Sequence, residues 1–366
     1  MANLKEVFLL FFRLGLTAFG GPAAHISMME QEVVSKRKWM SREHFMDLVG
    51  MTNLIPGPNS TEMTMHCGYE RAGVAGLFVA GIAFIVPAVT LTSLFAYFYV
   101  EYGEIPDVKA YLVGIKPAVV VIIGLALWKL GKTSLKTTWL WVVAIIAVLL
   151  CALGMSEIAV LFLVSIVSAI IFYSVEKKEQ SFFIAPLFVV SGVSNVKIFF
   201  SFLKIGAILY GSGYALIAYL QSEFVETGLL SSQEVIDAVG VGQFTPGPVL
   251  STAAFVGYLF GGFGTSIIAS LGIFLPSFIF VLVLNPIIPK LRKSQFFSIF
   301  LNSVNAVVVA LIFWVLVEFI REVLIDWRAI VIALVCTLIM FLFKLKFPSY
   351  WLVIVGSVLG KLLSIW

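Results

Sequence analysis

The sequence predicts an all-α polytopic membrane protein built from two homologous halves in inverted topology, and three observations lead to this fold class. The first is composition: 61% of the 366 residues are hydrophobic and 12% are charged, whereas soluble domains carry about 25% charged residues. The second is an internal repeat with broken or re-entrant helices, and the third is a reversal of loop charge between its two copies. The long apolar runs do not alternate with a period of two, so we expect helices and not barrel strands.

The first half begins with an apolar stretch, residues 7–34, which Gly20-Gly21-Pro22 interrupts. A basic segment and a short amphipathic piece lead to Pro56-Gly57-Pro58. Each proline removes a backbone N–H and pushes the residue before it out of the α region, so a helix ends here and Pro58 is placed to begin another. Four ordinary membrane spans are expected next, at about residues 74–100, 108–130, 139–153 and 158–175.

From residue 197 the same plan returns. Gly15 aligns with Gly206 at an offset of 191, and Pro56-Gly57-Pro58 aligns with Pro246-Gly247-Pro248 at an offset of 190. Chance matching of apolar segments would not align both glycines and prolines at nearly the same offset. The chain therefore divides into a first repeat, residues 1–180, a linker or short extra helix, residues 181–196, and a second repeat, residues 197–366.

Loop charges indicate how the two halves sit in the membrane. The basic loop at residues 36–38 corresponds to Glu226-Thr227, and the acidic loop at residues 101–107 corresponds to a basic one at residues 290–293. Since cytoplasmic loops carry the excess of Lys and Arg, the second half is expected to be upside down relative to the first. Such an inverted repeat places its site near the midplane, with the first Pro-Gly-Pro turn entering from the cytoplasm and the second from outside.

The number of crossings stays open between two alternatives. A broken spanning helix, a Pro-Gly-Pro hairpin and four spans give five crossings in each repeat, about ten in all, and place Lys5 outside. The alternative makes residues 7–34 and 198–225 hairpins as well and uses residues 181–195 as a crossing.

Four backbone breaks are the candidate substrate site, because non-helical backbone at membrane depth is tolerated only where protein buries it or a water-filled cavity meets it. The helix that follows each break offers free N–H groups and the positive end of its dipole, which suit an anion. The candidate residues at the breaks are Gly20, Gly21, Pro22, His25, Asn53, Pro56, Gly57, Pro58, Asn59, Ser60, Thr61, Gly211, Ser212, Gly213, Gln243, Pro246, Gly247, Pro248 and Ser251.

Two cationic side chains indicate that the expected substrate is negatively charged. Arg13 and Lys204 are repeat partners, each seven residues before its glycine break. An ionised side chain in hydrocarbon costs several kcal/mol unless it is paired or wetted, so both are functional candidates; the alternative is snorkelling to an interface. We expect the pair to face a central cavity and attract an oxyanion.

Three carboxylates are candidates for carrying a coupling proton: Glu62, Asp47 and Asp237. Glu62 stands in the first turn of the helix after Pro58, where the role expected first is that of a cap. A proton carrier should lose its pH dependence on substitution by Gln or Asn while anion binding persists.

No enzyme, cofactor or metal site is predicted. The chain has no P-loop and no His/Glu metal spacing, and its three cysteines stand singly in apolar surroundings. The net charge of +4 is explained by cytoplasmic loops, so no nucleic-acid partner is expected.

The stretch Leu16-Thr17-Ala18-Phe19-Gly20-Gly21-Pro22-Ala23-Ala24-His25-Ile26, the Trp39 after it and the paired Pro-Gly-Pro turns resemble the chromate ion transporter family in its long, two-domain form. The resemblance covers nearly the whole chain. It implies chromate efflux across the plasma membrane by a multi-pass protein, driven by a proton or another cation, with sulfate as a structural mimic. The second copy, Gly211-Ser212-Gly213, lacks the Pro and the His, which favours the first half as the better-equipped side.

Two other functions stay open, a passive anion channel and a non-transporting membrane assembly or lipid-handling protein. The sequence leaves the oligomeric state, including a homodimer, undecided.

Overall fold

The computed structural model describes residues 2–19, 21–52, 55–176, 195–210, 215–284, 295–343 and 349–364, and the regular structure in these ranges is entirely helical. Four helical stretches in them are long and apolar enough to cross a membrane: residues 59–102, 108–134, 249–283 and 295–323. The predicted all-α membrane class is therefore confirmed.

The first apolar stretch doubles back on itself. It forms α1 (Ala2–Thr17), α2 (Pro22–Met29) and the π-helix η1 (Glu30–Lys36). The turn is possible because Gly21 adopts a φ of 79° and Pro22 begins α2. At the far end of the two arms, the indole Nε1 of Trp39 donates to Glu6 Oε1 over 3.3 Å. Residues 7–34 therefore form a hairpin, which favours the second of the two alternatives over a broken spanning helix.

The Pro-Gly-Pro turn is a second hairpin, formed by α3 (Arg42–Thr52) and the start of α4 (Asn59–Tyr102). His44 Nε2 lies 3.3 Å from Glu70 Oε2 across its open end. A straight helix of 44 residues would extend about 66 Å, twice the roughly 30 Å of a hydrocarbon core. Instead α4 reverses at Ala72 and Gly73.

The reversal within α4 depends on glycine at the turn itself and in the two helical parts that the turn joins. Gly73 has a φ of 62°, which strongly favours a residue without Cβ. A methyl group on Gly68 would collide with the carbonyl oxygen of Gly76, so the two parts of α4 pack backbone against backbone.

The second half repeats this path. A hairpin of α8 (Asn195–Ile208), α9 (Ala215–Leu220) and η2 (Gln221–Val225) is closed by Ser201 Oγ, which donates to Glu223 Oε1 over 2.7 Å. The Pro-Gly-Pro hairpin consists of α10 (Ser232–Phe244), η3 (Val249–Ser251) and α11 (Thr252–Leu284).

The backbone angles of the two halves match at the long-helix reversals. Gly261 and Gly262 have φ/ψ of −175°/30° and 71°/−154°, against −148°/24° and 62°/−153° at Ala72 and Gly73. Gly261 and Gly262 therefore join two helical parts of α11, as Ala72 and Gly73 do in α4.

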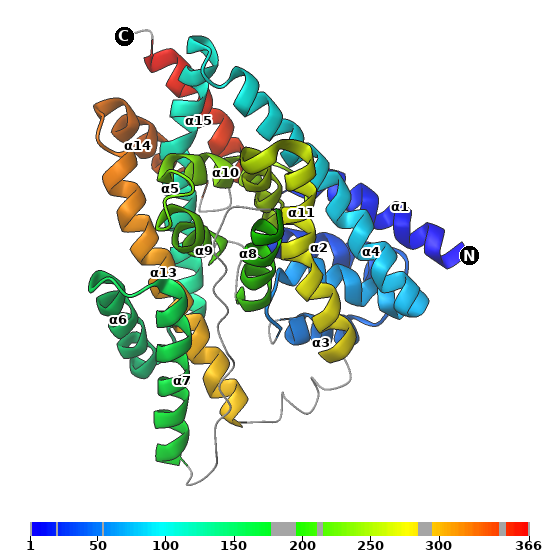
Figure 1. Ribbon diagram of the computed structural model, residues 1–366. Coiled ribbons are helices and arrows are strands. Elements are labelled where there is room, and N and C mark those ends of the chain that lie inside the picture. The colour runs from blue at the N-terminus through cyan, green and yellow to red at the C-terminus, as the bar shows by residue number, and fades with distance from the viewer. Residues whose placement is uncertain are drawn as a thin grey trace.

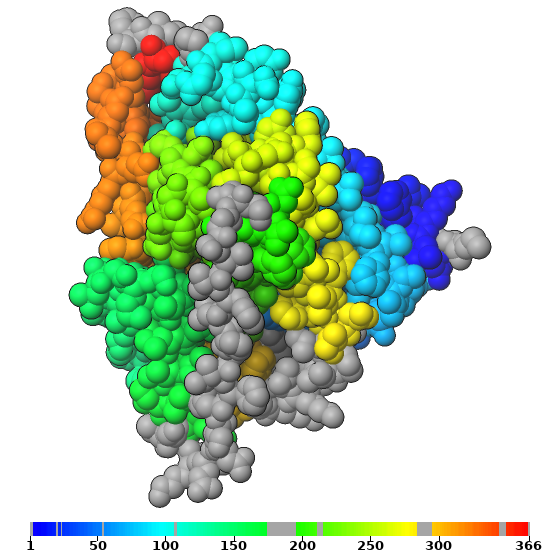
Figure 2. All heavy atoms as spheres, viewed as in Figure 1, coloured from blue at the N-terminus to red at the C-terminus, as the bar shows by residue number. Residues whose placement is uncertain are grey.

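The remaining helices pack across the halves. α5 (Pro106–Ser134) contacts α14 (Trp327–Leu342) and α15 (Ser349–Leu363), and α13 (Gln295–Val323) contacts α6 (Thr138–Ala152) and α7 (Glu157–Glu176). The predicted spans at residues 108–130, 139–153 and 158–175 are thus confirmed as helices. Figure 1 shows α6 and α7 at one end of the molecule and α14 and α15 at the other. In Figure 2 the same two groups, in green and orange, lie along one edge.

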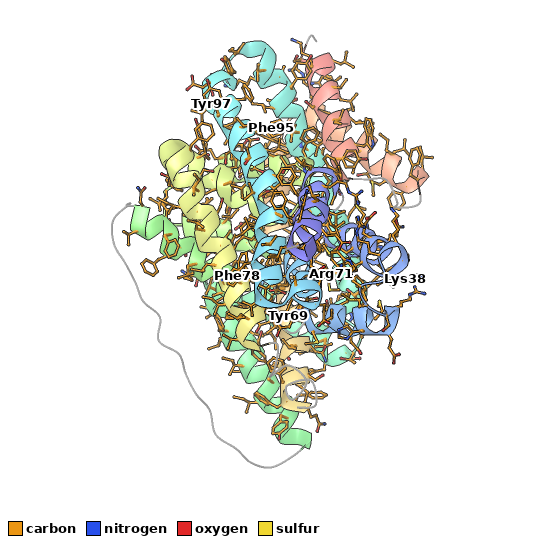
Figure 3. All side chains as sticks on the ribbon, turned by 90° about the vertical axis from the view of Figure 1, so that its right-hand side faces the viewer. Lys38, Tyr69, Arg71, Phe78, Phe95 and Tyr97 are labelled. Atoms are coloured by element: carbon orange, nitrogen blue, oxygen red, sulfur yellow. The ribbon has the colours of Figure 1, made fainter. Side chains whose placement is uncertain are left out.

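The long parts of α4 and α11 run antiparallel at the centre. The rings of Phe78 and Phe278 stack with centroids 5.5 Å apart, the hydroxyls of Ser93 and Ser266 are 2.6 Å apart, and Tyr97 stacks on Phe263. Figure 3 shows this part of α4 from Phe78 up to Phe95 and Tyr97, beside the yellow α11. The hairpin alternative uses residues 181–195 as an extra crossing. Of these, residues 181–194 lie outside the described part of the chain, which resumes at Asn195.

Candidate functional site

The tips of the hairpins meet in two pairs, and each pair joins one half to the other. The amide of Gly57 donates to the carbonyl oxygen of Leu209 over 2.6 Å, and the amide of Gly247 donates to that of Ala18 over 2.9 Å. Gly57 and Gly247 are repeat partners, and so are Ala18 and Leu209. The two hydrogen bonds are therefore equivalent and reciprocal.

Both Pro-Gly-Pro turns require their central glycine. Gly57 has a φ of 139° and Gly247 a φ of 90°, in the region that side chains with a Cβ rarely adopt. Pro58 is the N-cap of α4, which begins at Asn59, one residue later than predicted, and Pro248 is the N-cap of η3. Helix N-termini thus start directly behind the tips.

The first Pro-Gly-Pro turn encloses a polar cluster with no internal partners. Glu62 is fully buried, and neither of its carboxyl oxygens has a hydrogen-bond partner among the described residues. Its carboxyl lies against the Cα of Gly57. A Cβ added to Gly57 would collide with Glu62 Oε1 and lie 2.7 Å from Ser277 Oγ. The hydroxyls of Ser277 and Thr61 are likewise buried and without partner there. The prediction that Glu62 serves as a helix cap is wrong, because its carboxyl points back to the turn and caps no N–H.

The second turn has the same shape but satisfied polar groups. The hydroxyl of Thr92 donates toward Ser251 Oγ at 3.0 Å and lies 3.3 Å from that of Thr245. The position equivalent to Thr92 in the second half is Val281, buried and apolar. Val281 has no hydroxyl and cannot donate as Thr92 does.

His25 supports a tip through a backbone contact. It is 1% exposed, and its Nε2 lies 3.0 Å from the carbonyl oxygen of Ala18, so this nitrogen must carry the proton. The same carbonyl accepts the amide of Gly247, and the ring of His25 packs edge-on against Phe84. An anion-binding role for His25 stays a prediction.

Arg13 and Lys204 each pair with a glutamate on the opposite arm of their own hairpin. Arg13 lies 2.7 Å from Glu32, and Lys204 lies 2.5 Å from Glu223. Each glutamate follows its cation by 19 residues, so the repeat includes the ion pair. Both partners were missed from the sequence, although the same offset that relates the cations also relates Glu32 to Glu223.

The charge around Glu32 is strongly positive. Lys36 and Arg37 also contact its carboxylate. Burial alone would raise the pKa of Glu32, but hydrogen bonds from Lys36, Arg37 and Arg13 outweigh it and lower the pKa to about 2. Three cations contact the carboxylate of Glu32, whereas Lys204 alone pairs with Glu223.

The two candidate aspartates lie in different surroundings. Asp47 is exposed, but Asp237 is 5% exposed and its Oδ2 accepts a 2.9 Å hydrogen bond from Tyr99 and lies 3.4 Å from Lys116 Nζ. Lys116 extends the network to Gln233, which donates to Glu322 over 3.1 Å. Lys116 was also missed, although a lysine inside the apolar run at residues 108–130 is itself a signal of a functional or paired charge.

Several predicted site residues lie outside the described part of the chain: Gly20, Asn53, Gly211, Ser212 and Gly213. Of the others, Ser60 and Gln243 are buried beside their turns, and Asn59 begins α4. The structure therefore brings together the Pro-Gly-Pro tips with Ala18 and Leu209, and it places Arg13, Lys204 and Asp47 along the arms of the hairpins.

A helical membrane protein with several interrupted helices, whose re-entrant tips meet between two similar halves, has the architecture of a membrane transporter. The comparison with known proteins gives the family. The profile of the family described as "Chromate transporter" matches residues 5–172 and 196–361, and the chain belongs to this family.

The relatives it resembles carry corresponding names. A probable chromate transport protein of Synechococcus elongatus is 28% identical over 375 residues, covering 98% of this chain and 95% of its own. A chromate transport protein of Cupriavidus metallidurans is 28% identical over 358 residues, covering 93% and 89%. An uncharacterized transporter of Bacillus subtilis matches 151 residues at 27% identity, which is 41% of this chain but 84% of its own. No solved structure matches the chain.

Proposed function

We propose that the protein is a secondary transporter of tetrahedral oxyanions, chromate above all, across the plasma membrane. The observation that carries the proposal is the reciprocal contact of hairpin tips, Gly57 with Leu209 and Gly247 with Ala18. The start of α4 lies directly behind the buried first tip and the start of η3 directly behind the buried second tip, where fixed N–H dipoles favour a dianion. Sulfate has the same shape and charge and is the expected mimic.

We further propose that residues 1–180 and 197–366 are inverted repeats, joined by residues 181–196. Three observations support this: the reciprocal hydrogen bonds at the tips, the matching angles at Gly73 and Gly262, and the antiparallel packing of the equivalent parts of α4 and α11. The relative of about half the length is consistent with one repeat as a unit of its own. Substrate would be reached alternately from the two sides as the halves move about the tips.

The hairpin geometry predicts the side on which the N-terminus lies. Because Glu6 contacts Arg37 and Arg71, Lys5 shares the side of the basic loop at residues 36–38, which is cytoplasmic by the positive-inside rule. A single cysteine at Lys5 should react with an impermeant maleimide in inverted vesicles and not in intact cells. The native Cys67, Cys151 and Cys336 are buried and give a low background. Labelling from outside would contradict this topology and restore the five-crossing alternative.

Glu62 is proposed as the residue that carries the coupling proton. An unpaired buried carboxylate is strongly disfavoured, so the neutral acid suits the observed conformation. A charged Glu62 would also oppose a dianion at the tips, so proton and anion occupancy depend on each other. Asp237, with Lys116 and Tyr99 as partners, is the second candidate, and the exposed Asp47 is the third.

Arg13 is proposed to draw the anion toward the cytoplasmic mouth, together with Lys36 and Arg37 around Glu32. Arg13→Ala should raise the KM for anion presented from the cytoplasmic side about fivefold at low salt, and the effect should vanish at high salt because exposed charges are screened. Lys204→Ala is the matched control, since its pair with Glu223 leaves no excess charge. A lower maximal rate with unchanged KM in Arg13→Ala would contradict this steering role.

Flux into proteoliposomes tests the proposed function. Chromate uptake should follow an imposed proton gradient, exchange with internal chromate and fall in the presence of sulfate. Flux that ignores the gradient and lacks exchange would identify a passive channel instead. Absence of both flux and oxyanion binding would identify a non-transporting membrane protein.

A further inference from the structure

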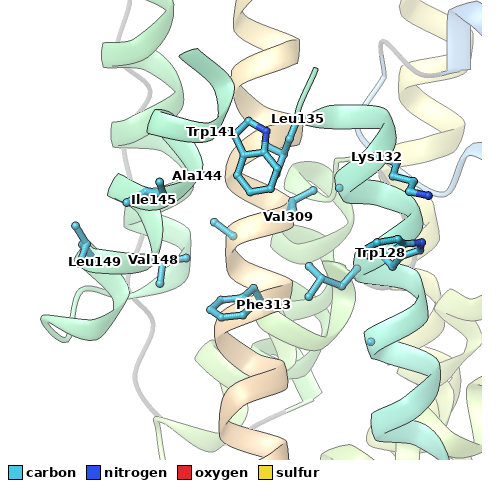
Figure 4. Close-up of a pocket in the computed structure, with 14 residues that line it drawn as sticks. Trp128, Lys132, Leu135, Trp141, Ala144, Ile145, Val148, Leu149, Val309 and Phe313 are labelled. Atoms are coloured by element: carbon cyan, nitrogen blue, oxygen red, sulfur yellow. The ribbon is translucent and has the colours of Figure 1, made fainter. Parts of the chain in front are cut away.

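A cavity of 710 Å³ opens between α5, α6 and α13, away from the hairpin tips. Its size lies in the range of about 300–1,000 Å³ found for small-ligand sites. Figure 4 shows Trp141, Ile145 and Leu149 from α6 on one side, Val309 and Phe313 from α13 behind, and Trp128 on α5. Of the 14 described residues that line it, Lys132 alone is charged.

The cavity exists because two glycines leave the face of α5 bare. A Cβ on Gly131 would meet no atom within 4 Å, and one on Gly124 would meet only the side chain of Leu316 at 3.9 Å. An offset of 189 aligns α5 with α13 end to end. At that offset Gly124 and Gly131 correspond to Phe313 and Ile320. The helix face that the two glycines leave open in the first half thus carries bulky side chains at the corresponding positions of the second half.

The mouth of the cavity is basic and aromatic. Lys132 is exposed, with its Nζ 4.5 Å from the centroid of the Trp128 ring. Lys129 and Lys136, both exposed, lie within four residues of it. Tryptophan and lysine together are typical of the membrane–water interface, and this basic loop is cytoplasmic by the positive-inside rule. An anionic group at Lys132 above an apolar groove fits both the charge and the lining.

We propose that this groove binds an anionic phospholipid, with one acyl chain against Gly124 and Gly131 and the phosphate at Lys132. The apolar wall excludes a soluble anion, and the lysines favour an acidic headgroup over a zwitterionic one. The lipid would fill the space between α6 and the pair α5–α13. This site is independent of the proposed transport site, since none of its lining residues belongs to the hairpin tips.

Native mass spectrometry of the detergent-purified protein with added phosphatidylglycerol or phosphatidylcholine tests the proposal. We expect one phosphatidylglycerol to be retained in preference to phosphatidylcholine. Gly131→Leu should abolish this retention, and Lys132→Gln should weaken it about fivefold, as expected for one lysine near an anionic surface. Leucine favours helix more than glycine does, and a Cβ on Gly131 meets no atom within 4 Å, so Gly131→Leu is expected to fold.

Two control variants complete the design. Gly264→Leu adds a leucine at another helical glycine with open space around its Cβ position. Lys361→Gln removes another lysine that lies over an aromatic ring, that of Tyr111. Both should retain the lipid as the unmodified protein does. Equal retention of the two lipids, or full retention by Gly131→Leu, would overturn the proposal. A dimer that dissociates in Gly131→Leu, with no lipid bound to either form, would overturn it in favour of a second copy of the chain.

Discussion

Replacing Gly57 by alanine is expected to abolish transport and to destabilise the protein strongly. At a φ of 139° any Cβ strains the backbone, and here it would also collide with the carboxyl of Glu62 and lie 2.7 Å from Ser277 Oγ. Backbone strain and overpacking each cost about 1–3 kcal/mol. The turn would have to shift, which breaks the hydrogen bond from Gly57 to Leu209. Melting temperature in detergent and chromate flux in proteoliposomes measure the two effects.

Alanine variants at two further glycines distinguish the effect of steric crowding from that of backbone strain. Gly247→Ala should behave like Gly57→Ala, because its φ is 90° and its Cβ would lie 2.7 Å from that of Ala88 and 3.2 Å from the carbonyl oxygen of Gly15. Gly154 has a φ of 85° with nothing within 4 Å, so Gly154→Ala should cost only the strain, about 1 kcal/mol, and leave transport intact. If all three variants lose the same small stability and transport normally, the tips are not closely packed and the proposed site is elsewhere.

The sequence predicts the hairpin turns and helices well, because these depend on local chemistry. Proline and glycine at residues 56–58 and 246–248 end helices wherever they stand. The reversal at Ala72 and Gly73 falls just before residue 74, where the first ordinary span was expected to begin. The apolar runs became helices within a few residues of their expected limits.

What the sequence could not predict is which residues meet across the fold. The ends of the first hairpin are joined by Glu6 and Trp39, and nothing local separates such a hairpin from a broken spanning helix of the same length. The contact of Thr92 with Ser251 joins residues 159 positions apart. The partners of Arg13 and Lys204 were within reach, since Glu32 and Glu223 recur at the offset of their cations, and Lys116 was visible as a charge within an apolar run.

The two halves share a backbone but differ in polar chemistry at the tips. Thr92 donates to Ser251 in the second turn, whereas the hydroxyl of Thr61 in the first turn has no hydrogen-bond partner among the described residues. The ring of His25 donates a hydrogen bond to the carbonyl oxygen of Ala18, whereas Leu216, at the equivalent position, has no donor for the carbonyl oxygen of Leu209. A symmetric pair of tips can hold an anion, but a titrating group is needed on one side only. This asymmetry supports the proposal that proton coupling lies in the first half.

Glu62→Gln is expected to abolish coupling while leaving anion binding within about twofold, because glutamine keeps the size and the neutral charge of the protonated acid. A gradient of one pH unit supports about tenfold accumulation for each coupled proton, and this accumulation should be absent in Glu62→Gln. Among the described residues, two further titratable side chains are close to Glu62: Tyr210, and His66 one turn along α4.

The measurement is proton uptake in weak buffer when anion is added to purified protein. Sulfate is the better probe for this purpose, since chromate itself binds protons near neutral pH. The unmodified protein should take up protons with sulfate, and Glu62→Gln should not. Glu70→Gln, at the other end of the same helical segment and paired with His44, should take them up normally. Proton uptake that persists in Glu62→Gln would exclude Glu62 and move the assignment to Asp237. There the corresponding Asp237→Asn variant is expected to lose stability as well, because it leaves the positive charge of Lys116 buried without its aspartate.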